Sequence, residues 1–329
     1  MSPEPSRPAP GARVAVSVLM PMRDPGAYLQ AAVDSVLQQD HRDLELVIID
    51  DGSRDGSRER VLAMSDPRIR LVDGPRAGIS ACLNTGLAHA TGAIVMRCDA
   101  DDLYPPGRVA RQVAWLQRHP QAIATCGAFS MVDAGGSLVA SPLRSLDQPV
   151  ADATDRILDG RLATHLCAFA IRREAVDRIG GFRPWFETAE DIDFALRLAE
   201  AGAVGFDPFD AYLYRLHGTS ITHTQASVRR RFYEQQARAM SGERRTTGAD
   251  ALMRGEPPAP PALDDPRAAR ADGAGLHVAQ LLVGQSWQAF AEGRRRAAIG
   301  AALRALASHP LHAAAWKALL LVSVRAAPR

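Results

Sequence analysis

Three aspartates stand within four positions of the chain, directly after an apolar run at 93–98. They are Asp99, Asp101 and Asp102, in the segment IVMRCDADDLYPP. Like charges at this spacing repel one another, so the cluster needs a positive partner. Mg²⁺ or Mn²⁺ meets that need, because these cations take one or two carboxylates and complete their shell with water and phosphate oxygens. The cluster therefore suggests a divalent metal that stabilises the charge of a diphosphate. A solvated acidic turn before the next helix is the alternative.

Two other kinds of site are excluded by residue type. An EF-hand calcium loop starting at Asp99 would need a ligand and a glycine where Leu103 and Tyr104 stand, and a glutamate at Ala110. A dinucleotide-binding loop would need Gly-x-Gly-x-x-Gly after the first strand, whereas the chain has MPMRDPG there.

The elements around the cluster predict where it lies in a fold. Short apolar, β-branched runs alternate with helical periodicity along the first part of the chain. We expect strands at 13–21, 44–50, 68–73 and 93–98, and helices at 26–39, 78–90 and 107–119. This alternation predicts an α/β fold with a mostly parallel central sheet flanked by helices. Ligands of such sheets bind beyond the carboxyl ends of the strands, where both DDGS (50–53) and DADD (99–102) fall.

The remainder of the chain predicts a helix at 187–202, a last strand and loop at 212–223, and a small C-terminal α-helical appendage. We expect a disordered leader at 1–12, one large domain at 13–240, a linker at 241–275 and a helical segment at 276–329. The alanine-rich appendage predicts two or three helices with spacing similar to one tetratricopeptide unit, and one copy makes no repeat array.

Six segments occur in an order that resembles one enzyme family. They are VSVLMPMRD, LELVIIDDGSRDGS, AGISACLNTGLAHATGAIVMRCDADDLYPPGRVARQV, IGGFRP, AEDIDFALRLAEAG and YRLHGTSIT. Together they resemble the family 2 glycosyltransferases over roughly residues 13–225. The resemblance implies a GT-A fold, which is Rossmann-like, and inverting transfer of a sugar from a nucleotide-diphosphate donor. UDP is the expected nucleotide.

The resemblance also implies roles for the residues after the strands. Asp51 would contact the donor base, with the backbone of Pro21 beside it, and Asp99 would face the ribose. Asp101 would bind the metal ion, Mn²⁺ or Mg²⁺, and Asp102 would support the same loop. DDGS has a second interpretation, because Asp, Gly and Ser favour a turn for local reasons.

Asp191 of AED matches the catalytic base of the family, and Glu190 is the alternative base. Adjacent helical positions differ by about 100°, so both side chains cannot face one pocket equally. Thr188 to Asp191 also has the form of a capping box, in which Asp191 would only bond back to the helix start.

Other basic and histidine side chains complete the expected site. His217 is a candidate metal or diphosphate ligand, or simply a loop histidine, and His165 has a functional or a packing role. Leu83 stands where many family members carry arginine. We expect Arg97, or else Arg76, to supply the missing donor contact.

Composition and charge bear on the cellular location and the partners of the protein. A formal net charge of +2 gives no argument for nucleic acid. The four cysteines lack a Cys-x-x-Cys pair, and the leader lacks the apolar core of a signal peptide, so we expect a cytoplasmic protein. Arginine runs at 229–231 and 294–296 would suit peripheral contact with the inner face of a membrane, or form solvated faces.

The predicted function is metal-dependent inverting transfer of a sugar to a hydroxyl of a saccharide, lipid-linked or protein acceptor in bacterial surface polysaccharide, glycolipid or glycoprotein synthesis. Two alternatives remain at this stage. One is a catalytically silent family member that binds a glycan or nucleotide. The other is a nucleotidyltransferase, which would need a glycine-rich, basic phosphate loop that PMRDPGAYL matches poorly.

Overall fold

The computed structural model describes residues 15–140, 148–162, 164–217, 227–261, 274–291 and 293–324. The chain forms two compact units. The first comprises Met1–Ala128 and Ser145–Tyr212, and the second comprises Phe129–Arg144 and Leu213–Arg329. The expected leader at 1–12 lies outside the described residues.

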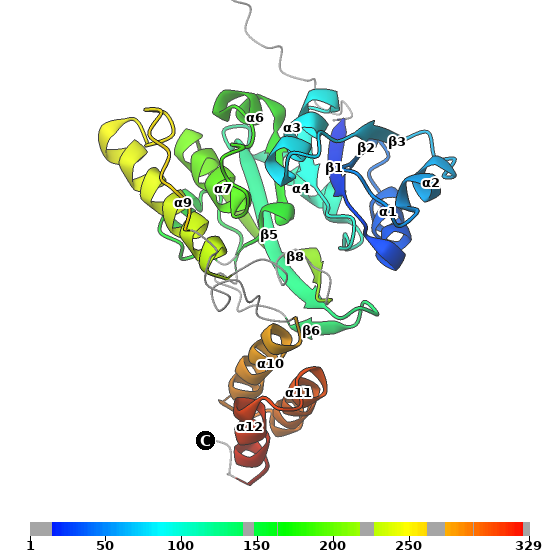
Figure 1. Ribbon diagram of the computed structural model, residues 1–329, viewed down its shortest axis with the longest axis vertical. Coiled ribbons are helices and arrows are strands. Elements are labelled where there is room, and N and C mark those ends of the chain that lie inside the picture. Colours follow the sequence, from blue (N-terminus) through cyan, green and yellow to red (C-terminus); the bar gives the residue numbers. More distant parts are fainter. Residues whose placement is uncertain are drawn as a thin grey trace, which may run out of the picture. The chain divides into compact units, whose positions relative to one another are not determined.

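Four strands of the first unit lie parallel, in the order β3-β2-β1-β4 (Figure 1). They are β1 (Val16–Met22), β2 (Leu44–Asp50), β3 (Ile69–Asp73) and β4 (Ile94–Arg97). Every residue of β1 is buried, as expected for a strand covered on both faces. The register pairs Met22 with Asp50 and Leu19 with Arg97, so the loops after β1, β2 and β4 leave the same edge of the sheet.

The sheet continues beyond β4 with mainly antiparallel strands, of which the sequence predicted only the one expected at 212–223. β7 (Phe169–Arg172) pairs with β4, and β5 (Ala124–Val132) pairs with β7. β8 (Val204–Arg215) pairs with β5, and β6 (Leu138–Ala140) pairs with the end of β5. The strand expected at 212–223 therefore starts eight residues earlier, and residues 218–223 lie outside the described part. The expected α/β fold is confirmed, with an antiparallel extension.

Helices cover the sheet of the first unit. They are α1 (Leu29–Leu37, after the short helix η1, Gly26–Tyr28), α2 (Ser57–Leu62), α3 (Ile79–His89), α4 (Arg108–Arg118), α5 (Thr154–Leu158), η2 (Leu166–Ala168), α6 (Arg173–Ile179) and α7 (Glu190–Ala201). The expected helices at 26–39, 78–90, 107–119 and 187–202 correspond to η1–α1, α3, α4 and α7. Phe194 and Leu198 of α7 pack with Val47 and Ile49 of β2 in one apolar core.

The second unit contains the helices α9 (Ser227–Thr247), α10 (Ala274–Ala291), α11 (Arg295–Ser308) and α12 (Ala313–Val324). The last three pack together (Figure 1). Buried alanines, whose small side chains allow close helix contact, lie on each of them. The linker expected from 241 begins inside α9, so its first seven residues are helical rather than extended. Arg244 pairs with the buried Asp250 at the end of that helix, which holds the following turn. The domain boundaries otherwise stay a prediction.

No helix within the described residues combines the length and the apolar character that crossing a bilayer requires.

Candidate functional site

The three aspartates of DADD form a tight turn directly after β4. The Asp102 amide donates to the Asp99 carbonyl at 3.1 Å. Tyr212 of β8 holds this turn at both ends, because its hydroxyl accepts from the Asp99 amide at 3.0 Å and donates to Asp102 Oδ2 at 2.7 Å. Asp102 and Tyr212 are both buried. The Asp102 carboxylate therefore shapes the loop from inside the protein.

The positive partner of the cluster is Arg97, the last residue of β4. Its Nε and Nη2 donate to the two carboxylate oxygens of Asp99 at 2.7 and 3.1 Å, and its Nη1 donates to Glu190 Oε1 at 3.1 Å. Burial alone would lower the pKa of Arg97, but the surrounding negative groups, Asp99 above all, hold that pKa well above its usual value. Arg97 therefore links the loop after β4 to the start of α7, across 93 positions of sequence.

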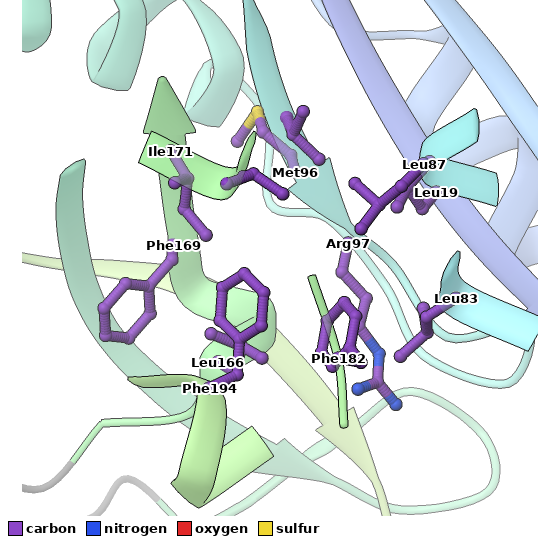
Figure 2. Close-up of a pocket in the computed structure, with 12 residues that line it drawn as sticks. Leu19, Leu83, Leu87, Met96, Arg97, Leu166, Phe169, Ile171, Phe182 and Phe194 are labelled. Atoms are coloured by element: carbon purple, nitrogen blue, oxygen red, sulfur yellow. The ribbon is translucent and has the colours of Figure 1, made fainter. Parts of the chain in front are cut away.

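The stem of Arg97 passes through apolar surroundings. Figure 2 shows it beside Leu83 and Phe182, at the edge of a cavity of about 20 Å³ that is otherwise lined by aliphatic and aromatic side chains. Apolar side chains along its aliphatic part and the carboxylates bonded to its guanidinium leave Arg97 little freedom. Arg97 thus acts as a positioning group here, and its expected contact with the donor stays a prediction.

The two candidate bases open helix α7. Ala189 is the N-cap, with a left-handed φ of 59° and no capping side chain, so the capping box that Thr188 would start does not form. Asp191 is half-buried, and its Oδ1 accepts from the amide of Ile192 at 2.9 Å. It has no other hydrogen-bond partner among the described residues, so its second carboxylate oxygen can accept from a hydroxyl.

Glu190 differs from Asp191 in environment. Its carboxylate is buried against Arg97. Burial, and secondarily the neighbouring Asp191 charge, raise the pKa of Glu190 to about 7, although Arg97 acts in the opposite direction. The single positive charge of Arg97 faces three carboxylates, those of Asp99, Glu190 and Asp191, and cannot neutralise all of them. Glu190 can therefore retain a proton near neutral pH while supporting Arg97.

The start of α7 is fixed by a buried network. Asp193 lies one helical turn in and accepts from Arg183 Nε at 3.0 Å and Arg197 Nε at 2.9 Å. Arg197 also donates to the Gly181 carbonyl at 2.8 Å. Gly181 has a φ of 73° and lies so close to Asn84 of α3 that a Cβ would approach Asn84 Oδ1 to 2.6 Å. The IGGF segment therefore requires glycine there, and it ties α7 to α3.

The donor-side residues lie at the ends of β1 and β2. Pro21 is buried in β1, opposite Ile49. Asp51 follows β2, and its Oδ1 accepts from the amide of Arg76 at 2.7 Å. The turn expected of DDGS is formed by its first aspartate instead, because Asp50 Oδ1 accepts from the Ser53 amide at 2.9 Å. Asp50 therefore forms the turn, and the contact of Asp51 with the donor base stays a prediction.

The residues present suit one hard divalent cation. Among the described residues no group of three His, Cys, Asp or Glu side chains is placed to hold a metal ion by itself. Asp99 is engaged by Arg97 and Asp102 by Tyr212, whereas Asp101 is half-buried, and its role as the metal ligand of the loop stays a prediction. A single carboxylate matches Mg²⁺ or Mn²⁺, which take most remaining ligands from water and substrate phosphate. His217 is buried in the second unit, and its role as a ligand stays a prediction.

Several supporting residues were not found from the sequence. Tyr212 is the most informative, and its only sequence signal is the alternation of YLYR in an expected strand. The ring of His165 stacks on Tyr212 with centroids 5.6 Å apart, and its Nδ1 accepts from the Cys167 amide at 3.2 Å. These contacts are those of a packing residue, and a functional role of His165 stays a prediction. The buried Arg108 lies with its guanidinium 3.9 Å from the centre of the Tyr104 ring.

Comparison with known proteins identifies the family. The sequence profile of Glycosyl transferase family 2 matches residues 17–180. EpsE of Bacillus subtilis (strain 168), which is named as a glycosyltransferase, is 31% identical over 213 residues, covering 62% of this chain and 73% of EpsE. The chain is a family 2 glycosyltransferase. This glycosyltransferase is also 29% identical to a chondroitin synthase of Pasteurella multocida (strain Pm70) over 66% of its own length, but it spans only 22% of that larger protein.

Solved structures agree on the fold of the glycosyltransferase. S. aureus TarS 1–349 in complex with UDP-GlcNAc superposes with a TM-score of 0.60 at 16% identity, covering 89% of this chain and 81% of TarS 1–349. The mannosyltransferase PcManGT of Pyrobaculum calidifontis, in complex with GDP-Man and Mn²⁺, gives a TM-score of 0.54 at 23% identity, covering 98% and 88%. These similarities establish a GT-A glycosyltransferase fold.

Proposed function

We propose that this enzyme transfers a sugar from a nucleotide-diphosphate donor to a hydroxyl acceptor in a single inverting displacement. One observation supports the proposal most. Arg97 donates hydrogen bonds to both Asp99 and Glu190, so the loop that carries Asp101 lies next to the helix start that carries Asp191. A loop for the diphosphate beside a carboxylate for the acceptor is the arrangement that such a displacement needs.

In the proposed reaction Asp191 accepts the proton of the acceptor hydroxyl. The acceptor oxygen forms a bond to the anomeric carbon while the bond from that carbon to the diphosphate oxygen breaks, and the nucleotide diphosphate leaves. Attack from the opposite face inverts the configuration. General base assistance of this kind contributes about 10²–10⁴-fold. Arg97 keeps the reacting groups aligned by fixing the loop and the helix start together.

Asp101 would hold Mn²⁺ or Mg²⁺, which when bound stabilises negative charge on the leaving diphosphate. Asp51 and Pro21 would form the nucleobase side of the site and Asp99 the ribose side. Manganese is supported by the PcManGT complex, which contains Mn²⁺. The other carboxylates of the loop remain engaged by Arg97 and Tyr212, so they shape the site without competing for the cation.

The proposed donor is a UDP-sugar and the proposed acceptor a hydroxyl in polysaccharide, glycolipid or glycoprotein synthesis. The support comes from relatives. TarS was solved with UDP-GlcNAc and with UDP, and the Pasteurella multocida relatives are named chondroitin synthase and hyaluronan synthase. The PcManGT complex contains GDP-Man, so GDP is the alternative nucleotide to test.

A thermal-shift and hydrolysis screen tests this function. We expect UDP with Mn²⁺ to raise the melting temperature more than either component alone, and Asp101→Asn to abolish that synergy. Release of nucleotide diphosphate from the matching nucleotide sugar should stop in excess chelator and resume with added Mn²⁺. Absence of a shift with every nucleotide would favour a silent binding protein. Full turnover in excess chelator would contradict the metal's role.

A further inference from the structure

Helix α12 exposes a continuous apolar stripe to solvent. Trp316, Leu320 and Val324 are 57%, 64% and 74% exposed. They recur every four residues, so they lie along one face of the helix. Leu311, just before the helix, is also strongly exposed. We refer to Leu311, Trp316, Leu320 and Val324 as the α12 stripe.

The stripe is not the core-facing side of the helix. The opposite face, with Ala315, Ala318 and Val322, is fully buried within the second unit. Trp316 Nε1 donates to the Pro310 carbonyl at 2.9 Å, which fixes the indole and satisfies its only donor. The ring is therefore held with its apolar surface outward. Contiguous exposed apolar surface of this kind is typical of a contact site.

Positive charge lies near the stripe, at Lys317 and at the end of α12. Lys317 is the only charged residue of α12. Arg295 donates to the carbonyls of Val322 and Ser323, which places the arginine run 294–296 at the end of α12 where Val324 lies. Residues 274–324 contain five Arg or Lys and a single acidic residue. A partner for this surface should be apolar and negatively charged.

The other arginine run does not offer such a surface. Beside 229–231, Tyr233 is buried and Phe232 is half-buried, so their rings pack into the protein. Arg230 already pairs with Glu234 at 2.8 Å. Of the two runs considered from the sequence, only 294–296 adjoins exposed apolar side chains.

We propose that the α12 stripe docks onto an anionic lipid bilayer. Tryptophan, leucine and valine would enter the boundary between headgroups and acyl chains, and Arg294, Arg296 and Lys317 would contact anionic headgroups. A second copy of the chain is a less favourable occupant. Pairing two such faces would bring like charges together, and neither α11 nor α12 carries an acidic residue to offset them. The proposal does not depend on the catalytic mechanism.

Vesicle flotation with the full chain tests the proposal. The probes are phosphatidylcholine vesicles and phosphatidylcholine–phosphatidylglycerol vesicles. One variant combines Trp316→Gln with Leu320→Gln, and a second combines Arg294→Gln with Arg296→Gln, leaving the helix-capping Arg295 in place. The matched control combines Leu62→Gln with Met253→Gln, because those side chains are 65% and 63% exposed but do not belong to α12. Circular dichroism and melting curves verify that each variant is folded.

We expect the wild type and the control to float only with the anionic vesicles. The Trp316/Leu320 variant should lose at least tenfold in partitioning, and each arginine removed should cost about fivefold. Three results would overturn the proposal: no flotation of the wild type, equal flotation of the wild type and the Trp316/Leu320 variant, or a wild-type dimer in light scattering that this variant converts to a monomer. The last result would make the stripe a self-association surface.

Discussion

At the scale of residues, each of the three clustered aspartates has a different role. Asp99 is held by Arg97, Asp102 is held by Tyr212, and Asp101 is the one proposed to meet the metal. Asp99 and Asp102 thus have partners within the protein before any substrate binds. Removing one partner of a buried charge pair is strongly destabilising, whereas the pair itself adds little. We infer that Arg97 serves alignment of the site more than stability.

Glu190 should make stability depend on pH. Its pKa is raised from an ordinary 4.5 to about 7, so it favours folding at low pH and this contribution is lost as pH rises through 7. In Glu190→Gln the loss cannot occur. As pH rises from 5 to 8, the unfolding free energy of the variant minus that of wild type should therefore increase, by at most about 3 kcal/mol. Denaturant unfolding at several pH values measures this difference.

Glu174→Gln, at an exposed position of α6, is the control and should follow the wild-type pH dependence. If the curves of Glu190→Gln and wild type stay parallel over this range, Glu190 does not titrate near neutral pH and its assigned environment is wrong.

Tyr212→Phe should destabilise the turn formed by Asp99 to Asp102 without creating a cavity in the core. The ring and its stacking on His165 remain, but Asp102 Oδ2 and the Asp99 amide lose their partner. We expect a loss of about 1–3 kcal/mol in unfolding free energy. We also expect a higher Mn²⁺ concentration for half-maximal donor hydrolysis, with a larger effect on donor KM than on kcat.

Tyr104→Phe provides the comparison, because Tyr104 is also buried and its hydroxyl donates to the Arg97 carbonyl at 2.9 Å, not to a carboxylate. A similar stability loss without the shift in Mn²⁺ dependence is expected there. Equal metal dependence in wild type, Tyr104→Phe and Tyr212→Phe would reduce Tyr212 to a packing residue.

At the scale of elements, sequence patterns predicted the parallel half of the sheet and, of the remaining strands, only the end of β8. The runs at 44–50 and 93–98 are short, apolar and followed by turn residues, so both strands and the positions of their ends could be predicted. β5 is buried on both faces and lacks alternation, and β7 is only four residues long, so neither stands out locally. The order of the motifs identified Asp101 and Asp191 as candidate site residues. The Arg97 bridge between their segments is a tertiary contact that local pattern does not encode.

Gly205 of β8 should be intolerant of any side chain. A Cβ there would lie 1.9 Å from the indole ring of Trp115 in α4, and both elements are packed in the core. Gly205→Ala should lower the unfolding free energy by about 1–3 kcal/mol or more, because the indole has no room to move. Thermal or denaturant unfolding measures the loss.

Gly242→Ala in α9 is the opposite case, since a Cβ there meets nothing within 4 Å. It should be neutral or stabilise by about 1 kcal/mol through helix propensity. Equal effects of the two substitutions would contradict the packing of β8 against α4.

At the scale of the whole molecule, the chain joins a GT-A unit to a helical unit that reaches its last described residues. The family match covers 17–180, so it includes most of the first unit and Phe129–Arg144 of the second, but not the C-terminal helices. Chemistry is therefore proposed in the first unit and lipid contact in the second. Loss of vesicle binding in the α12 variants should leave hydrolysis of a soluble nucleotide sugar unchanged.

The central claim is that Asp191 activates the acceptor at a site aligned by Arg97. The most direct test is the rate of nucleotide diphosphate release by Asp191→Asn, with exposed Asp177→Asn on α6 as control. We expect the rate to fall by about a hundredfold or more, with donor binding and melting temperature close to wild type. A folded Asp191→Asn enzyme that turns over at the wild-type rate would contradict the account.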